Sequence, residues 1–141
     1  GEHDISSQDV LVLVDGGIGE LVLNRPQRKN ALSPSLVVAL TTGLRELITN
    51  PEVTVILIRG NGPEPTAEEP TSRWLCSGVD LKEQARVRRK TGTDGGQAKS
   101  WAEFHAAMYS CPKPTVGVLE GGAIAGEMTT RRKLSSRRSC C

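Results

Sequence analysis

Two stretches decide the fold of this chain: Trp74-Leu-Cys-Ser-Gly-Val-Asp-Leu-Lys-Glu83 and Cys111-Pro-Lys-Pro-Thr-Val-Gly-Val-Leu-Glu-Gly-Gly-Ala-Ile-Ala-Gly126. Both combine small residues with glycines, so their backbone can approach a bound molecule closely. The prolines that open the second stretch end a helix. Residues 115–119 then form a short apolar run that predicts a buried strand, before a glycine-rich turn.

Upstream of these stretches, residues 10–14 and 18–24 read as two strands. Asp15-Gly16-Gly17 between them is a hairpin signal. A nucleotide-binding glycine loop does not fit here, because its third glycine is missing and a strand follows where a helix is needed. Arg25-Pro26 ends the second strand, since proline cannot donate to a ladder.

A helix is predicted from Ser33-Pro34, with serine as the N-cap and proline at the first helical position. Its apolar side chains recur at helical spacing: Leu36, Val37, Leu40, Leu44, Leu47 and Ile48. Asn50-Pro51 ends this helix. The β-branched run 53–58 predicts a buried strand.

Residues 60–73, with three prolines, and residues 86–96, with Arg-Arg-Lys and Gly-Gly, are expected to be loops. A second helix is predicted over 97–110, with Trp101, Phe104 and Met108 on one face. Strand–strand–helix units in this order predict an α/β architecture with helices packed on a sheet.

The two opening stretches, together with Asn24-Arg25-Pro26 and Asn30-Ala31-Leu32, resemble the crotonase superfamily of enoyl-CoA hydratases and isomerases. The resemblance covers residues 10–126 and rests on several local signals that agree. It implies an α/β fold, an incomplete crotonase-like ββα spiral. The expected organisation is an N-terminal extension at 1–9, a partial crotonase-like domain at 10–126 and a divergent basic tail at 127–141.

The resemblance also implies a site for acyl-CoA thioesters, whose reactions pass through an enolate. Two backbone N–H groups, those of Val79 and Gly126, would form an oxyanion hole, and such a donor is worth about 3–4 kcal/mol. Relatives usually carry alanine where this chain has Val79. Further residues are assigned by resemblance to binding coenzyme A: Arg28, Lys29, Cys76, Ser77, Gly78, Asp80, Leu81 and Lys82.

Catalytic carboxylates are not found where the family has them. Thr129 stands at the position of a hydratase glutamate, Glu127 falls where a glycine is expected, and the second acid would come after Cys141. Proton transfer at the α-carbon needs a carboxylate within hydrogen-bond reach. We therefore expect a truncated, catalytically impaired hydratase/isomerase-like chain. The alternative is a non-catalytic coenzyme A-binding module, or a dominant-negative partner in homo- or hetero-oligomers with full-length relatives.

Composition excludes several other classes. Apolar residues make up 37% and charged residues 24%, as in globular proteins. Outside the last eleven residues the chain holds 13 basic and 16 acidic residues, so no nucleic-acid partner is expected. No run is long enough for a membrane helix, and no signal peptide is recognised. An intracellular location in the mitochondrion, peroxisome or cytosol is expected. Neither a metal nor a cofactor is expected beyond coenzyme A in the substrate.

The remaining reactive side chains receive structural interpretations. Cys76 and Cys111 are expected to be reduced packing residues, and His105 a structural or surface histidine. The tail Arg131-Arg-Lys-Leu-Ser-Ser-Arg-Arg-Ser-Cys-Cys141 has three interpretations: a frameshifted or alternatively spliced end, a lipidation signal, and a phosphorylation target at Ser135 or Ser139. A membrane contact is expected only if this tail is lipidated.

Overall fold

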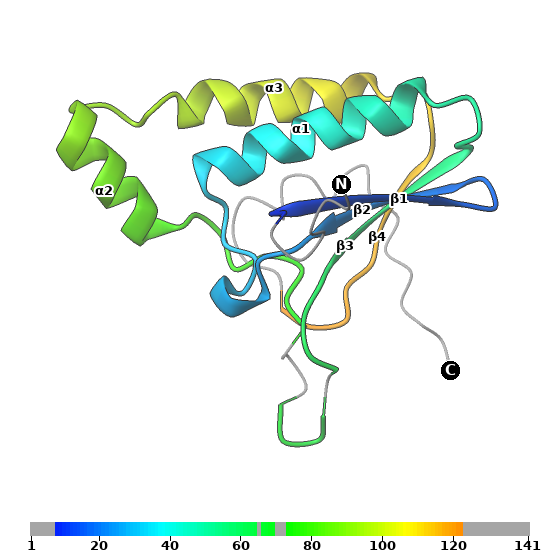
Figure 1. Cartoon of the computed structure of the whole chain (residues 1–141), viewed down its shortest axis with the longest axis horizontal. Coiled ribbons are helices and arrows are strands. Elements are labelled where there is room, and N and C mark those ends of the chain that lie inside the picture. Colours follow the sequence, from blue (N-terminus) through cyan, green and yellow to red (C-terminus); the bar gives the residue numbers. More distant parts are fainter. Residues whose placement is uncertain (1–7, 65, 70–72, 123–141) are drawn as a thin grey trace, which may run out of the picture.

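A four-stranded sheet in the order β1-β2-β3-β4 organises the chain (Figure 1). The computed structural model describes residues 8–64, 66–69 and 73–122. The strands are β1 (Val10–Asp15), β2 (Ile18–Leu23), β3 (Val55–Gly60) and β4 (Thr115–Gly117). Strands β1 and β2 are antiparallel, whereas β2, β3 and β4 run parallel. This arrangement confirms the predicted α/β architecture.

The β1–β2 hairpin turns at Gly16 and Gly17, as its sequence predicts. Both glycines have positive φ, 55° and 82°, and Asp15 pairs with Ile18 across the two-residue loop. A tight hairpin loop of this kind needs left-handed backbone, which glycine adopts without steric cost.

Helix α1 (Pro34–Thr49) covers one face of the sheet. Ser33 caps it, its Oγ accepting a hydrogen bond from the Leu36 N–H at 3.2 Å. Gly43 lets the helix approach the sheet, because a Cβ there would lie 2.7 Å from Leu21 Cδ1. Helix α3 (Gln97–Ser110) packs on α1 and joins the same core, contributing Phe104, Ala107 and Met108.

Residues 86–96 were predicted to be a loop, but residues 86–91 belong to a helix. Helix α2 (Leu81–Thr91) is capped by Asp80 and ends at Gly92, whose φ is 71°. No residue of α2 is buried, so it shows no apolar periodicity in the sequence. Arginine and lysine are good helix formers, and near a C-terminus they interact favourably with the helix dipole. The prediction was wrong because this helix depends on caps and charge rather than on an apolar face.

Strand β3 is buried on one face and half-buried on the other. Ile56 and Ile58 are buried towards the helices, whereas Val55 and Leu57 are only half-buried. The strand also begins two residues later than the apolar run, although Val53 joins the core. In the part of the chain that the structure describes, no helix is long and apolar enough to cross a membrane.

Candidate functional site

The two glycine-containing stretches lie side by side at one end of the sheet. The N–H of Leu75 donates to the carbonyl oxygen of Gly122 at 3.0 Å. The Trp74 ring packs against Gly122 so closely that a Cβ at this glycine would collide with it. Arg73 adds an ion pair to Glu120 at 2.7 Å. Residues 120–122 of the second stretch are therefore held against the first, while Gly126 lies outside the described residues.

The turn at residues 78–80 leaves one backbone donor open. Leu32 forms a parallel bridge beside Val79: its N–H donates to Gly78 O at 2.7 Å, and its carbonyl accepts from Asp80 N at 2.9 Å. The Gly78 N–H is directed to Cys76 Sγ at 3.2 Å. Since both bridge bonds go to its neighbours, the Val79 N–H points away from Leu32. Within the described ranges, no acceptor faces it.

Gly78 makes this geometry accessible. Its φ is 95°, a left-handed conformation that residues with a Cβ rarely adopt. The conformation reverses the backbone between buried Cys76 and the exposed Val79. Val79 itself is exposed at this turn, so a ligand oxygen could reach its N–H and accept a hydrogen bond from it.

Asn30 supports the turn from behind. Its fully buried side chain accepts from the Arg25 N–H at 2.7 Å and donates to the carbonyls of Asn61 at 3.1 Å and Trp74 at 2.7 Å. Lys29 and Asn30 both have positive φ, 50° and 52°. The Asn-Arg-Pro and Asn-Ala-Leu motifs thus meet the first stretch through Asn30.

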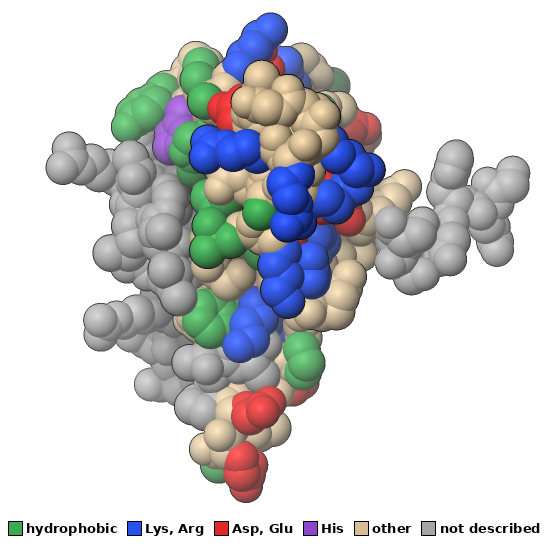
Figure 2. All heavy atoms as spheres, turned by 90° about the vertical axis from the view of Figure 1, so that its left-hand side faces the viewer, with side chains coloured by type: hydrophobic (Ala, Val, Ile, Leu, Met, Phe, Trp, Pro, Cys, Tyr) green, Lys and Arg blue, Asp and Glu red, His purple; other side chains and the backbone are tan. Residues whose placement is uncertain are grey.

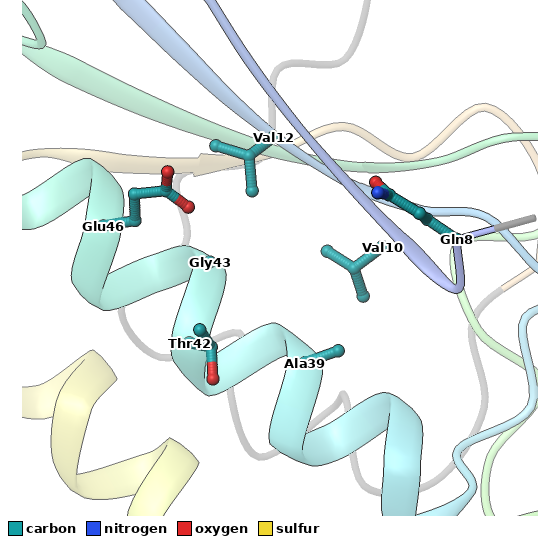
Figure 3. A pocket seen from close by; sticks show the side chains of 7 residues that line it. All are labelled: Gln8, Val10, Val12, Ala39, Thr42, Gly43 and Glu46. Carbon is teal, nitrogen blue, oxygen red and sulfur yellow. The ribbon is translucent and has the colours of Figure 1, made fainter. Parts of the chain in front are cut away.

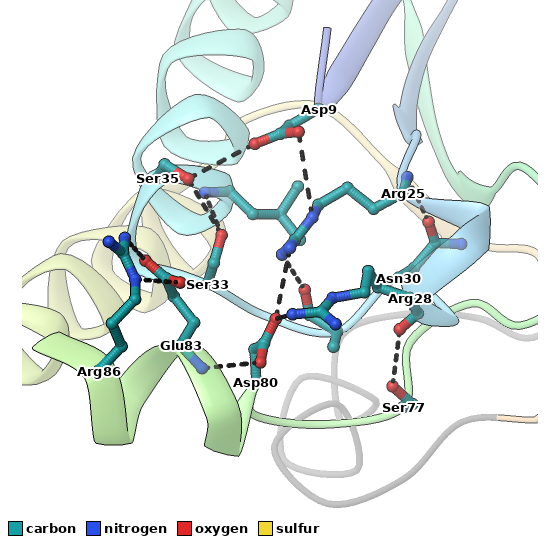
Figure 4. Close-up of polar contacts among 12 residues, drawn as sticks. Asp9, Arg25, Arg28, Asn30, Ser33, Ser35, Ser77, Asp80, Glu83 and Arg86 are labelled. Carbon is teal, nitrogen blue, oxygen red and sulfur yellow. Dashed lines mark hydrogen bonds and ion pairs between the residues drawn. The ribbon is translucent and has the colours of Figure 1, made fainter. Parts of the chain in front are cut away.

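Asp80 is the most buried charge of the site, with 6% of its surface exposed. Its Oδ1 accepts from the Glu83 N–H at 3.0 Å, and its Oδ2 lies 3.3 Å from Arg25 Nη2 and 3.5 Å from Arg28 Nη2 (Figure 4). Burial raises the pKa of this carboxyl, but the Glu83 hydrogen bond and the two guanidinium charges outweigh it. The pKa is therefore below its ordinary value, and Asp80 is charged at neutral pH.

The other residues assigned to coenzyme A divide into two groups. Arg28, Lys29, Leu81 and Lys82 have exposed side chains, and Lys29 Nζ lies 5.4 Å from the centre of the Trp74 ring. Ser77 Oγ donates to Arg28 O at 3.4 Å, which ties the two segments together. In contrast, the side chains of Cys76 and Asp80 are turned into the protein, where their contacts are with the chain itself.

Basic side chains gather over this end of the molecule (Figure 2). They belong to the η2 turn (Pro26–Arg28), to Lys29 and to the exposed face of α2, which adds Lys82, Arg86, Arg88, Arg89 and Lys90. The sequence assigned Lys82 to this site but not Arg86, Arg88, Arg89 and Lys90, because residues 86–96 were predicted to be a loop. The signal was Asp80 at the N-cap and Gly92 after the last basic residue.

Other features of the described residues offer less chemistry. A hollow of about 460 Å³ between β1 and α1 is lined by Gln8, Val10, Val12, Ala39, Thr42, Gly43 and Glu46, and so holds a single carboxylate (Figure 3). His105 packs edge-on against Trp101, and burial lowers the pKa of its imidazole. Within the part of the chain described, no group of three or more potential ligands is suited to a metal ion.

Comparison with known proteins gives the family of this chain. The family model "Enoyl-CoA hydratase/isomerase" matches residues 14–129, which include strands β2 to β4, the three helices and both stretches. The chain belongs to this enoyl-CoA hydratase/isomerase family. A peroxisomal Δ3,5-Δ2,4-dienoyl-CoA isomerase of Arabidopsis thaliana is 29% identical over 122 residues, which are 79% of this chain and 40% of that protein. A putative enoyl-CoA hydratase of Thermus thermophilus is 30% identical over 112 residues, with the same coverage.

Solved structures give the same family fold. A Pseudomonas aeruginosa protein superposes with a TM-score of 0.76 at 27% identity, over 94% of this chain and 52% of that one. A putative enoyl-CoA hydratase/isomerase family protein from Hyphomonas neptunium, at 22% identity, gives a TM-score of 0.74 over 92% of this chain and 46% of that one. This family member thus spans about two fifths of the curated relatives it matches and about half of these structures.

Proposed function

We propose that this chain binds acyl-CoA thioesters, with the Val79 N–H donating to the thioester oxygen. The observation that carries the proposal is the open amide of Val79 in the first stretch, four residues after Leu75, which bonds to the second stretch. Family membership supports the substrate class, since the relatives above are named for reactions of enoyl-CoA and dienoyl-CoA esters.

The proposed chemistry follows from where charge develops. When a thioester is converted to its enolate, negative charge moves onto the former carbonyl oxygen. A donor that is already fixed in place stabilises this charge without reorganising, which lowers the barrier. In the proposed site Val79 supplies one donor. Gly126 is expected to supply the second, from the part of the chain that the structure does not describe.

The basic end of the molecule suits the other half of the substrate. Coenzyme A carries a diphosphate and a 3′-phosphate, and guanidinium and ammonium groups are the usual partners of phosphate oxygens. Arg28, Lys29 and Lys82 are exposed beside the Val79 turn. We assign them to the phosphates, and the turn to the thioester end.

We expect this polypeptide to lack the group that transfers a proton to or from the substrate. Thr129 occupies the position at which hydratases of the family carry glutamate, and a hydroxyl does not act as a base near neutral pH. In the described residues near Val79, the one buried carboxylate is Asp80, which is engaged by two arginines. We therefore propose binding with little or no turnover by these 141 residues. Hydration of crotonyl-CoA well above background would contradict this.

A pair of ligands tests the binding proposal. Butyryl-CoA and its thioether analogue S-butyl-CoA share every phosphate and differ in the carbonyl oxygen. By calorimetry we expect the thioester to bind about threefold to tenfold more tightly, the range for one net hydrogen bond. Equal affinities, or no binding, would contradict the proposal.

Charge reversal tests the phosphate assignment separately. Lys29→Glu should weaken both ligands by a similar factor, because both carry the same phosphates. The control is Arg45→Glu, an equally exposed basic residue on α1, which should leave both affinities nearly unchanged. Equal effects of the two variants would show that the electrostatic attraction of the phosphates is non-specific. Lys29 would then not be a phosphate contact.

A further inference from the structure

Asp80 joins two segments that lie far apart in the sequence. Its Oδ2 pairs with Arg25, 55 residues earlier, and its Oδ1 caps the first turn of α2. Its own backbone N–H closes the bridge to Leu32. One residue therefore fixes the Val79 turn to the Asn-Arg-Pro segment by its side chain and to Leu32 by its main chain.

The arginine partner is itself immobilised. Arg25 has a side chain only 14% exposed, and its Nη1 donates to the carbonyl oxygen of Ala31 at 2.9 Å. Ala31 immediately precedes Leu32. The contacts thus close a ring, from the Asp80 carboxylate to Arg25, from Arg25 to Ala31, and from Leu32 back to the Asp80 N–H. Figure 4 shows the contact between Asp80 and Arg25.

This ring sets the direction of the neighbouring amide. Val79 lies between Gly78 and Asp80, whose backbone groups are both bonded to Leu32. With both neighbours fixed, the peptide plane of Val79 has little freedom to rotate towards another acceptor. Burial alone would not have this effect, because it is non-directional.

We propose that Asp80 and Arg25 are positioning residues that hold the Val79 N–H outward, ready for the ligand oxygen. This role differs from the contact with coenzyme A expected for Asp80 from the resemblance. Its importance for the thioester rests on the function proposed above, whereas the ordering of the turn does not require any ligand.

Asp80→Asn isolates the charge pair. Asparagine is nearly the same size and is an equally good N-cap, so the Glu83 hydrogen bond is retained while the ion pairs with Arg25 and Arg28 are lost. The matched control is Glu83→Gln, which removes the exposed Glu83–Arg86 pair from the same helix. Arg25→Lys is the second variant: it keeps a positive charge and loses the fork that reaches both Asp80 and Ala31.

The first readout needs no ligand. In the ¹⁵N-labelled chain, the heteronuclear NOE of the Val79 amide should match that of α1 in the wild type and in Glu83→Gln. It should fall in Asp80→Asn and in Arg25→Lys, with the amides of α1 unchanged. If the Val79 amide stays as ordered in both variants as in the wild type, the proposal is overturned.

The second readout links the ring to the thioester. Asp80→Asn should reduce the preference for butyryl-CoA over S-butyl-CoA from about threefold to tenfold to near unity. The ratio of the two affinities is the readout, because loss of the Asp80 charge beside Arg28 alters phosphate binding by both ligands alike. A preference retained in full overturns the positioning role. A wild type without any preference, together with a lowered NOE in the variants, overturns the proposed function instead and leaves the ring established.

Discussion

Helices α1 and α2 are stabilised in opposite ways, α1 by apolar burial and α2 by polar contacts. Helix α1 buries seven residues and packs on both the sheet and α3, whereas α2 buries none. What holds α2 is polar: the Asp80 cap, the Gly92 C-cap and the Glu83–Arg86 pair. In this molecule, the apolar core around α1 provides stability, and the polar contacts around Asp80 orient the backbone donors of the candidate site.

The separation has a physical reason. Burial of apolar surface is strong but non-directional, so it suits a core that only has to stay packed. A backbone donor must point at one place, and hydrogen bonds and ion pairs impose such directions. The polar network around Asp80 and Asn30 therefore lies where a ligand is proposed to bind, and the apolar core lies behind it.

The largest expected effect comes from truncating a leucine in the core. Leu44 is fully buried in α1, so Leu44→Ala should lower the free energy of unfolding by about 2–5 kcal/mol. Leu81→Ala in α2, at a side chain 72% exposed, should change it by less than about 0.5 kcal/mol. Urea denaturation of both variants measures the contrast. Similar losses would break the distinction between the two helices.

An intermediate effect is expected at the polar support of the turn. Asn30→Ala removes three buried hydrogen bonds and leaves their backbone partners unsatisfied, which should cost about 1–3 kcal/mol. Asn50→Ala, which loses one exposed bond to the Glu52 N–H, is the control and should cost less. If the two variants were equally stable in urea, Asn30 would not be the support that its contacts indicate.

The charge of Asp80 predicts a dependence on pH. Because the folded state lowers the pKa of this carboxyl, its stabilising contribution is present above the ordinary value of about 3.9 and is lost as pH falls through the folded pKa. Asp80→Asn lacks this contribution. The stability difference between wild type and variant should therefore be constant from pH 7 to 5 and shrink below pH 4. A difference that does not change with pH would contradict the ion pair.

The smallest effect is expected at His105. Burial lowers its pKa, so the folded state favours the neutral imidazole, and stability should decline as pH falls below the ordinary value of about 6.5. His105→Gln should remove this decline. Thermal melts between pH 7.5 and 5 measure the two slopes, and equal slopes would show that His105 is not desolvated among its aromatic neighbours.

The elements that were predicted are those whose own residues favour the observed structure. The glycine pair at 16–17 predicted the hairpin, and Ser33-Pro34 with its helical apolar spacing predicted α1. The helix over 97–110 was predicted with its observed bounds. Helix α2 was missed because an exposed helix has no apolar period. The run 53–58 predicted a buried strand, but a run of apolar residues does not say which face the helices cover.

The sequence by itself determined the fold class, the family and the two stretches that form the candidate site, because glycines, prolines and apolar spacing act over a few residues. Only the tertiary structure decided that Leu32 lies beside Val79, that Leu75 meets Gly122, and that Asp80 points at Arg25. These contacts join residues about 45 to 55 positions apart, and no local pattern encodes which distant groups will meet. The direction of the Val79 amide is therefore a property of the assembled fold.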